Sequence, residues 1–263
     1  RMHILLAMAN CWYHKKDFAV AKKNYSHYSV LCRSKYGDKS IEYANSLYYL
    51  ANIEGFTNEK QVGCKDYRQA AILLKELIKK QLRYMPTNAR TKYWNDLSDI
   101  LWNMTAYAAK IGLKQESFVC DAYNALVFSK GLLLEAERSM RNLLRQGGAE
   151  EDLALYNKML LLQSRLAEVE RTIGKGTEGA NELYSQIDQI DKQLASRCSF
   201  YGNYTQFLNT QYEDIKNALK EGEVAIDFTD FKLDSVHCYA AYVLRKEWEY
   251  PLLVPLFNQT QLD

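Results

Sequence analysis

Apolar and aromatic residues recur at helical spacing from residue 3 to about residue 85. These positions, three or four residues apart, are Leu5, Met8, Ala9 and Trp12, then Phe18, Ala21, Tyr25 and Tyr28, and, after a break at Gly37-Asp38, Tyr43, Leu47, Leu50, Ala51, Tyr67, Ala70, Leu74 and Leu77. Residues at this spacing share one face of a helix. The repetition predicts two successive helical hairpins of the kind found in repeat arrays.

A longer helical hairpin is predicted over residues 87–145. The apolar face of its first helix carries Thr91, Tyr93, Trp94, Leu97, Ile100, Leu101 and Met104, and the second helix carries Phe118, Tyr123, Leu126, Phe128, Leu132, Leu133 and Leu134. Ile111-Gly112 separates the two helices, and Gly147-Gly148 ends the second. Glycine suits such ends because it adopts conformations that other residues avoid.

Residues 151–203 show a heptad pattern on both sides of a glycine-rich break. The seam positions are Leu155, Met159, Leu162, Leu166, Val169 and Ile173, then Leu183, Ile187, Ile190 and Leu194. Alternating steps of four and three residues are typical of coiled-coil packing. The short break at residues 174–179 favours an antiparallel pair within one chain. An intermolecular coiled coil is the alternative.

Helical spacing stops near residue 220, and extended segments follow. Val224–Phe228, Tyr239–Leu244 and Leu252–Leu256 have the composition of strands, and the first alternates with period two. Strands after two hundred helical residues indicate a domain boundary near residue 205. The expected fold class is therefore mainly α, with tetratricopeptide-like hairpins and a long antiparallel hairpin, followed by the first few β-strands of an incomplete α/β domain.

Composition excludes several kinds of site. The six cysteines are scattered without CxxC spacing and there are only four histidines, so we expect no metal and no cofactor. Scattered cysteines favour a reducing compartment, and no apolar run is long enough to span a bilayer, so we expect a cytoplasmic protein without membrane contact. The twenty tyrosines are expected to be half-buried packing residues with hydrated hydroxyl groups.

The net charge of +2 names no partner, but the first fifty residues are locally basic. The cations there are Lys15, Lys16, Lys22, Lys23, Arg33, Lys35 and Lys39. They constitute either a solvated helix face or a surface for an anionic partner. Binding of nucleic acid or nucleoprotein through this basic part is the alternative functional hypothesis, and no glycine-rich basic arm supports it.

The two predicted hairpins resemble the tetratricopeptide repeat. Ala9 and Ala21 are expected where the helices of the first hairpin cross, because larger side chains would separate them. The second unit departs from the pattern, since Met8 to Ala21 spans thirteen residues whereas Leu50 to Ala70 spans twenty. About seven residues are therefore inserted, and Phe56–Gly63 is the expected protruding loop. Another kind of α-hairpin array is the alternative.

The resemblance implies a peptide-binding concave surface formed by the first helix of each hairpin. Aligning Met8 with Leu50 puts Asn10 and Asn52 at the same repeat position, and asparagine can both donate to and accept from a peptide backbone. The candidate partner-binding residues on this face are His3, Leu6, Asn10, Tyr13, Asn45, Tyr48 and Asn52. The alternative is that the asparagines bond neighbouring helix ends.

Much of the chain resembles the CHAT family, whose caspase-like domains follow tetratricopeptide repeats in bacterial proteins. The segments that carry the resemblance are Arg90–Trp94, Ala122–Leu126, Lys130–Leu134, Ala218-Leu219, Gly222–Phe228, Tyr239–Leu244 and Pro251–Phe257. The resemblance implies a cysteine peptidase in which a histidine activates a cysteine thiolate. It also implies that both catalytic residues follow later strands than the three present here, so the chain is expected to stop early in that domain.

His237 and Cys238 are adjacent, but we expect no catalytic dyad from them. Neighbouring residues of a strand point to opposite faces, whereas a general base must lie within about 3 Å of its nucleophile. We therefore expect no enzyme activity and no catalytic residue in this chain, whose full-length parent would be the peptidase.

The expected organisation is repeats over residues 1–86, a further hairpin over 87–149, the coiled-coil-like hairpin over 150–204 and the opening strands over 205–263. The expected function is a protein-interaction and regulatory scaffold. Its partners would be a protein or peptide in the repeat groove and the rest of the CHAT domain.

Overall fold

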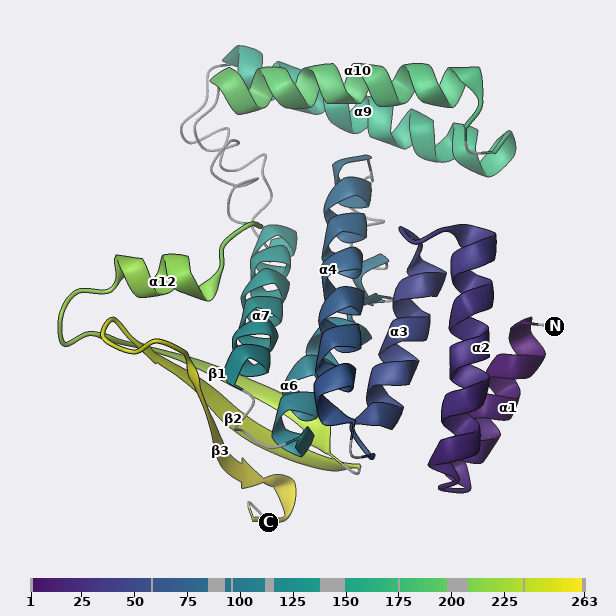
Figure 1. Ribbon diagram of the computed structural model, residues 1–263. Helices are drawn as coiled ribbons and strands as arrows, with labels where there is room; N and C mark the ends of the chain where they lie inside the picture. The colour runs from purple at the N-terminus through teal and green to yellow at the C-terminus, as the bar shows by residue number, and fades with distance from the viewer. Residues whose placement is uncertain are drawn as a thin grey trace. The chain divides into compact units, whose positions relative to one another are not determined.

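The computed structural model describes residues 2–57, 59–84, 93–95, 97–111, 116–137, 150–174, 176–197, 208–233 and 235–261. Its first two hairpins pair α1 (Met2–His14) with α2 (Phe18–Tyr36), and α3 (Ile41–Glu54) with α4 (Lys60–Tyr84) (Figure 1). The Val20 amide donates to Asp17 Oδ1 at the start of α2, and the Tyr43 amide donates to Ser40 Oγ at the start of α3. Gly37 ends α2 with a φ of 88°, which confirms the predicted break.

Small residues allow the first helices to approach closely. Ala9 and Ala21 are fully buried in one cluster with Tyr25, Leu50 and Ile53, so the predicted crossing at these alanines is confirmed. Half-buried Leu6 and Tyr13 pack against the same cluster. The prediction for Met8 was wrong, because 45% of this side chain is exposed on the other side of α1.

The predicted protruding loop at Phe56–Gly63 is also wrong. Helix α3 ends at Glu54 and α4 already begins at Lys60, so half of the predicted loop, residues 60–63, is helical. The Phe56 ring stacks on Phe18 with a centroid distance of 4.9 Å, and it lies edge-on to Tyr13. The segment therefore closes over the first hairpin.

The next two helices, α6 (Asp99–Ile111) and α7 (Glu116–Glu137), join α4 through buried aromatic rings. Tyr67 of α4 lies 4.9 Å from Tyr107 of α6 and 5.7 Å from Phe118 of α7, measured between centroids. Tyr67 is fully buried and its hydroxyl donates to the Ile100 carbonyl at 2.9 Å. For this tyrosine the expected half-buried ring with a hydrated hydroxyl was wrong, since the hydroxyl is satisfied inside the protein.

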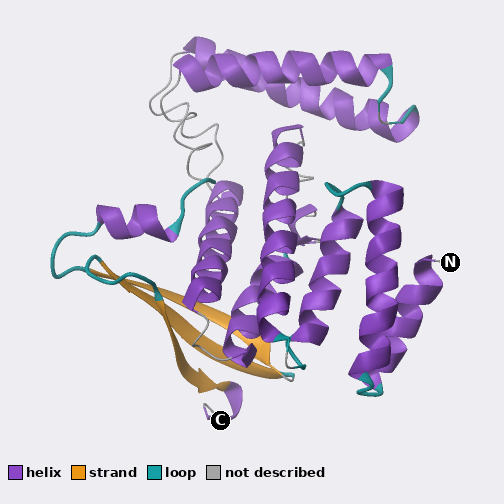
Figure 2. Ribbon diagram, in the orientation of Figure 1, coloured by secondary structure: helices purple, strands orange, loops and turns teal. Residues whose placement is uncertain are grey.

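After the short helix α12 (Tyr212–Ala218), three strands form an antiparallel sheet in the order β1-β2-β3 (Figure 2). They are β1 (Val224–Leu233), β2 (Val236–Arg245) and β3 (Leu252–Asn258), followed by the 3₁₀ helix η1 (Gln259–Gln261). The three predicted strands are confirmed, and each is longer than predicted. The fold is thus mainly α-helical with a small sheet near the end of the described chain.

The heptad region forms an antiparallel hairpin of α9 (Glu150–Thr172) and α10 (Glu178–Arg197). Met159, Leu162 and Leu166 are buried against Ile187 and Leu194, which confirms the antiparallel pairing within one chain. Leu155 and Val169 are only partly buried. Ile173 lies beyond the last residue of α9 and 70% of it is exposed, so its predicted seam position was wrong.

The chain divides into two compact units. The first comprises Arg1–Leu77, Ser98–Val127 and Gln211–Asp263, and the second comprises Ile78–Leu97 and Phe128–Thr210. The sheet therefore belongs to the same unit as α1, α2, α3 and α6. Thr91, Gly147-Gly148 and the predicted boundary near residue 205 lie outside the described residues.

Candidate functional site

One face of the sheet packs against helices of its own unit. Tyr242 of β2 is fully buried and stacks on Tyr123 of α7, with ring centroids 4.9 Å apart. The Tyr242 and Thr105 hydroxyl oxygens lie 3.0 Å apart, and the Tyr123 hydroxyl donates to Asp227 Oδ2 at 2.6 Å. Burial beside the Asp227 carboxylate raises the pKa of Tyr123. This inner face is fixed by hydrogen bonds as well as by aromatic packing.

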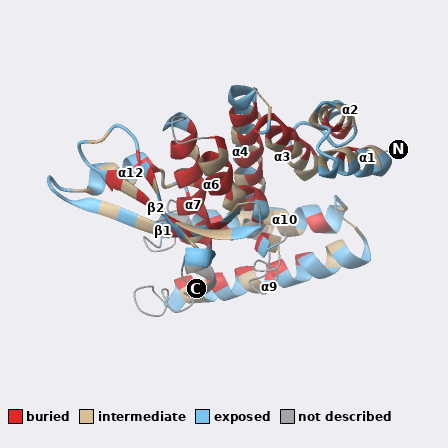
Figure 3. Ribbon diagram, turned by 90° about the horizontal axis from the view of Figure 1, so that it is seen from below, coloured by how far each residue is buried: buried red, intermediate tan, exposed pale blue. Residues whose placement is uncertain are grey.

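The opposite face, here called the outer sheet face, carries large apolar residues that are exposed, and Figure 3 shows exposed and intermediate residues along β1. The strand register defines its residues as Val224, Ile226, Phe228, Asp230 and Lys232 of β1, His237, Tyr239, Ala241, Val243 and Arg245 of β2, and Leu252, Val254 and Phe257 of β3. Ile226 is 51% exposed and Phe228 is 67% exposed, whereas Phe231 and Thr229 of the inner face are buried. The exposed side of β1 thus carries large apolar residues, which is typical of a binding surface.

Aromatic rings and a hydrogen bond order one end of the outer sheet face. His237 stacks on Tyr239 at 5.2 Å, and Tyr239 lies 4.9 Å from Phe257, measured between centroids. His237 Nε2 lies 2.6 Å from Asp230 Oδ2. These contacts hold flat rings side by side at the surface.

The arrangement of His237 and Cys238 follows the strand alternation. His237 pairs with exposed Lys232 on the outer face, whereas Cys238 pairs with buried Phe231 on the inner face. The imidazole contacts Asp230, and Cys238 Sγ donates to the Val236 carbonyl at 3.7 Å. Histidine and thiol therefore belong to different faces and have different partners.

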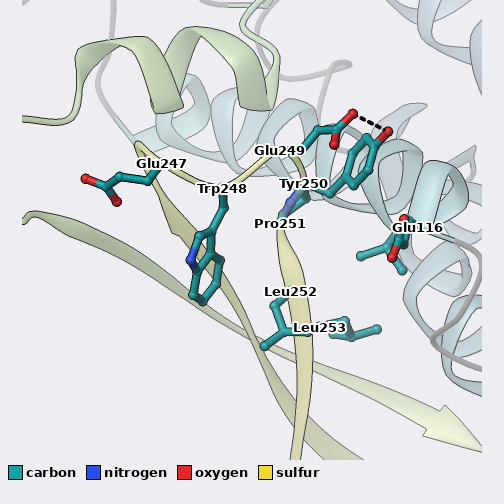
Figure 4. A pocket seen from close by; sticks show the side chains of 9 residues that line it. Glu116, Glu247, Trp248, Glu249, Tyr250, Pro251, Leu252 and Leu253 are labelled. Carbon is teal, nitrogen blue, oxygen red and sulfur yellow. Dashed lines mark hydrogen bonds between the residues drawn. The ribbon is translucent and has the colours of Figure 1, made fainter. Parts of the chain in front are cut away.

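A cavity of about 490 Å³ opens between the start of α7 and the turn that joins β2 to β3 (Figure 4). Its lining residues are Glu116, Val119, Glu247, Trp248, Glu249, Tyr250, Pro251, Leu252 and Leu253. The Tyr250 hydroxyl donates to Glu249 Oε1 at 2.7 Å, and the Arg245 guanidinium lies 5.8 Å from the Trp248 ring. With three glutamates in its lining, the cavity could accommodate a cationic group. No sequence pattern indicates this cavity, because α7 and the turn are distant in the chain.

The predicted repeat-face residues lie on α1 and α3, but their side chains are used differently. His3 and Asn10 are exposed, whereas Asn45, Tyr48 and Asn52 are half-buried. Asn10 Oδ1 accepts from the Tyr25 hydroxyl at 2.6 Å, so this asparagine bonds the neighbouring helix. Asn52 Nδ2 donates to the Tyr48 carbonyl of its own helix, and Asn103 Nδ2 donates to the Tyr48 hydroxyl. A shared grip on a peptide by Asn10 and Asn52 stays a prediction.

A buried polar group between α2, α3, α4 and α6 was not expected. Glu54 is 2% exposed, and its Oε1 lies 3.1 Å from Lys22 Nζ, which also contacts Glu59. Glu54 Oε2 and the Tyr107 hydroxyl are buried without a hydrogen-bond partner among the described residues. Burial raises the pKa of Glu54, because removal from water disfavours its charged form.

Several of the predicted basic residues have contacts within the chain. Lys22 is held by Glu54 and Glu59, Arg33 lies over the Tyr43 ring and Lys35 over the Tyr36 ring. The charge of Lys22 is therefore offset by carboxylates of the chain, whereas Arg33 and Lys35 remain exposed cations.

The described part of the chain contains no group of three or more metal-ligating side chains and no helix long and apolar enough to cross a membrane. Its five described cysteines are free thiols, and burial raises the pKa of Cys64 to about 11. Comparison with family models, with curated proteins and with solved structures found no match.

Proposed function

We propose that this chain is the protein-interaction and regulatory region of a bacterial CHAT-family cysteine peptidase, itself without the catalytic histidine and cysteine. The observation that carries the proposal is the outer sheet face, which exposes Ile226 and Phe228 while Phe231 and Tyr242 of the inner face are buried. A sheet with one dry face and one apolar exposed face is suited to contact further protein. The helical hairpins before it are suited to a scaffold role, since stacked hairpins offer extended binding surfaces.

The reading frame beyond the codon for Asp263 tests the parent. We expect it to continue for about another domain length and to encode a histidine after one strand and a cysteine after a later strand. A stop codon immediately after Asp263 would contradict the assignment to a CHAT peptidase.

A thiol-reactive peptidase probe tests the absence of catalysis. A protein translated from the longer reading frame should react rapidly with the probe. The chain that ends at Asp263 should react no faster than a protein with ordinary free cysteines. Cys238→Ser should leave folding and binding unchanged, and Cys11→Ser is the matched control because Cys11 is an exposed thiol. Peptide hydrolysis by the present chain that is lost only in Cys238→Ser would contradict the proposal.

A further inference from the structure

The cavity between the start of α7 and the β2–β3 turn has an apolar floor. Val119 of α7, Pro251 of the turn and Leu253 of β3 are buried there. Trp248 and Leu252, which are more exposed, complete the apolar part of the lining. An alkyl chain that enters the cavity therefore contacts apolar side chains, and the burial of its methylene groups favours binding.

The charged residues among those that line the cavity are all acidic. Glu116 is the first residue of α7, and Glu247 and Glu249 belong to the turn. Within the described part of the chain, none of these three carboxylates lies within ion-pairing distance of a lysine, arginine or histidine. Carboxylates gathered without a counter-charge attract a cation.

The two cations that precede the turn do not line the cavity. Lys246 Nζ donates to the Leu219 carbonyl at 2.8 Å, just beyond the end of α12. The Arg245 guanidinium lies 5.8 Å from the Trp248 ring. The three carboxylates of the lining outnumber these two cations, so the charge around the cavity is negative.

Two of the carboxylates are placed to act together. In Figure 4, Glu249 and Tyr250 extend toward the side of the turn on which Glu116 lies, whereas Glu247 extends away from it. The hydrogen bond with Glu249 raises the pKa of Tyr250, and the nearby charge of Glu116 also raises it. Both carboxylates therefore influence the Tyr250 phenol, and a cation beside this ring would be attracted by both.

We propose that this cavity binds an arginine or lysine side chain of a protein partner. The alkyl part of that side chain lies against Val119 and Leu253. Its charged group lies beside Glu116 and Glu249. Basic side chains bind in this way because their methylene groups are buried on apolar surface while the charged end stays near water. The inference rests on the proposed role as an interaction module and adds the chemistry of one residue of the partner.

Two peptides that differ only in charge at one side chain test this inference with the full chain. One has a central arginine flanked by glycines, and the other has citrulline, the uncharged analogue of arginine, in its place. The readout is the NMR resonance of the Trp248 indole N–H, which is identified by its loss in Trp248→Phe.

We expect the arginine peptide to bind in the millimolar range, since a single side chain is anchored. It should bind about fivefold or more tightly than the citrulline peptide at about 50 mM salt, with a smaller difference at about 300 mM.

Paired variants test the carboxylates. Glu116→Gln with Glu249→Gln should abolish the preference for arginine, because the amides keep the shape of the side chains but lose their charge. Glu178→Gln with Glu221→Gln is the matched control, since it removes two negative charges from exposed positions outside the cavity, and it should keep the preference. Circular dichroism verifies that both double variants are folded.

Equal affinity for the two peptides, or no shift of the Trp248 resonance at about 20 mM of either peptide, would overturn the inference. So would binding of butylguanidinium about tenfold more tightly than the arginine peptide, because the occupant would then be a free small cation. These outcomes leave the CHAT assignment open to its own test, since the reading frame and the thiol probe do not depend on peptide binding.

Discussion

Gly63 of α4 sits against α6 with no room for a side chain. A Cβ built on it would lie 2.1 Å from the Tyr107 hydroxyl oxygen, 3.0 Å from Glu54 Cβ and 3.1 Å from the Ala51 carbonyl oxygen. The last of these atoms is backbone and cannot move independently. The close approach of α3, α4 and α6 therefore depends on a hydrogen atom at this position.

Gly63→Ala should lower the free energy of unfolding by about 1–3 kcal/mol, because the inserted methyl group forces the helices apart. Urea denaturation followed by circular dichroism measures the change. Gly179→Ala in α10 is the control, because nothing lies within 4 Å of a Cβ there, and it should raise stability by up to about 1 kcal/mol. If Gly63→Ala is as stable as the unsubstituted chain, α4 and α6 are not in contact at Gly63.

The rings of Tyr67 and Tyr107 are neighbours, but among the described residues only the Tyr67 hydroxyl has a hydrogen-bond partner. Tyr67→Phe removes a buried hydrogen bond to the Ile100 carbonyl and should cost about 1 kcal/mol. Tyr107→Phe removes a buried hydroxyl that has no partner among the described residues, so it should be neutral or stabilising. Thermal unfolding of the two variants gives the comparison, and an equal loss in both would indicate that the Tyr107 hydroxyl is satisfied in solution.

At the scale of elements, the α9–α10 hairpin is held by a narrow apolar seam. Leu162 is 5% exposed within this seam, whereas its neighbour Leu161 is 55% exposed on the opposite side. Adjacent positions of one helix thus have different environments, which provides a matched pair of variants.

Leu162→Asp should destabilise the hairpin by more than about 3 kcal/mol, because it loses apolar burial and desolvates a carboxylate. Leu161→Asp should change stability by no more than about 0.5 kcal/mol. Proteolytic cleavage of the whole chain within residues 150–197 measures unfolding of the hairpin. Sedimentation velocity measures association of the chain. A concentration-dependent dimer that Leu162→Asp dissociates would instead support the intermolecular coiled coil.

The elements that could be predicted from sequence are those with repeated local patterns. The heptad steps around Met159 and Leu166 indicate a seam, and the small residues Ala9 and Ala21 indicate a close crossing. The ends of elements could not be predicted in this way, as Ile173 shows, because a helix can end before its apolar pattern does. The position of Phe56 depended on its packing against Phe18, which no local pattern encodes.

The orientation of the sheet was the least predictable feature from sequence. Alternation in β1 separates Ile226 and Phe228 from Asp227 and Thr229, and the apolar set would ordinarily be assigned to the core. In the structure Asp227 faces inward because Tyr123 donates to it, so the more apolar side of β1 is exposed. Only the contact between β1 and α7 reveals which face is available for binding.

At the scale of the whole molecule, burial of acidic side chains makes stability depend on pH. Burial raises the pKa of Glu54 above 4.5, and it raises the pKa values of Asp66 and Asp121 above 3.8 although Lys22 and Arg68 lie near them. The folded state then binds protons more tightly than the unfolded state in the range between the ordinary and the raised pKa values. Stability should therefore decrease as pH rises through that range.

We expect the free energy of unfolding to be larger at the acidic end of this range than at pH 8. Urea denaturation at a series of pH values measures the slope, and Glu54→Gln should reduce it because the titrating carboxyl is removed. Glu221→Gln, in the exposed turn before β1, is the control and should leave the slope unchanged. A slope that is unaffected by Glu54→Gln would contradict the burial of that carboxyl.

The contacts of the sheet with α6 and α7 also affect how the chain is synthesised. Tyr123 and Asp227 are 104 residues apart, and Thr105 and Tyr242 are 137 residues apart. At translation rates of about 5–20 residues per second, Tyr123 is synthesised roughly 5–20 s before Asp227. During that interval the helix surface that the sheet will cover stays open to solvent, so the nascent chain is a candidate for chaperone binding until β2 is complete.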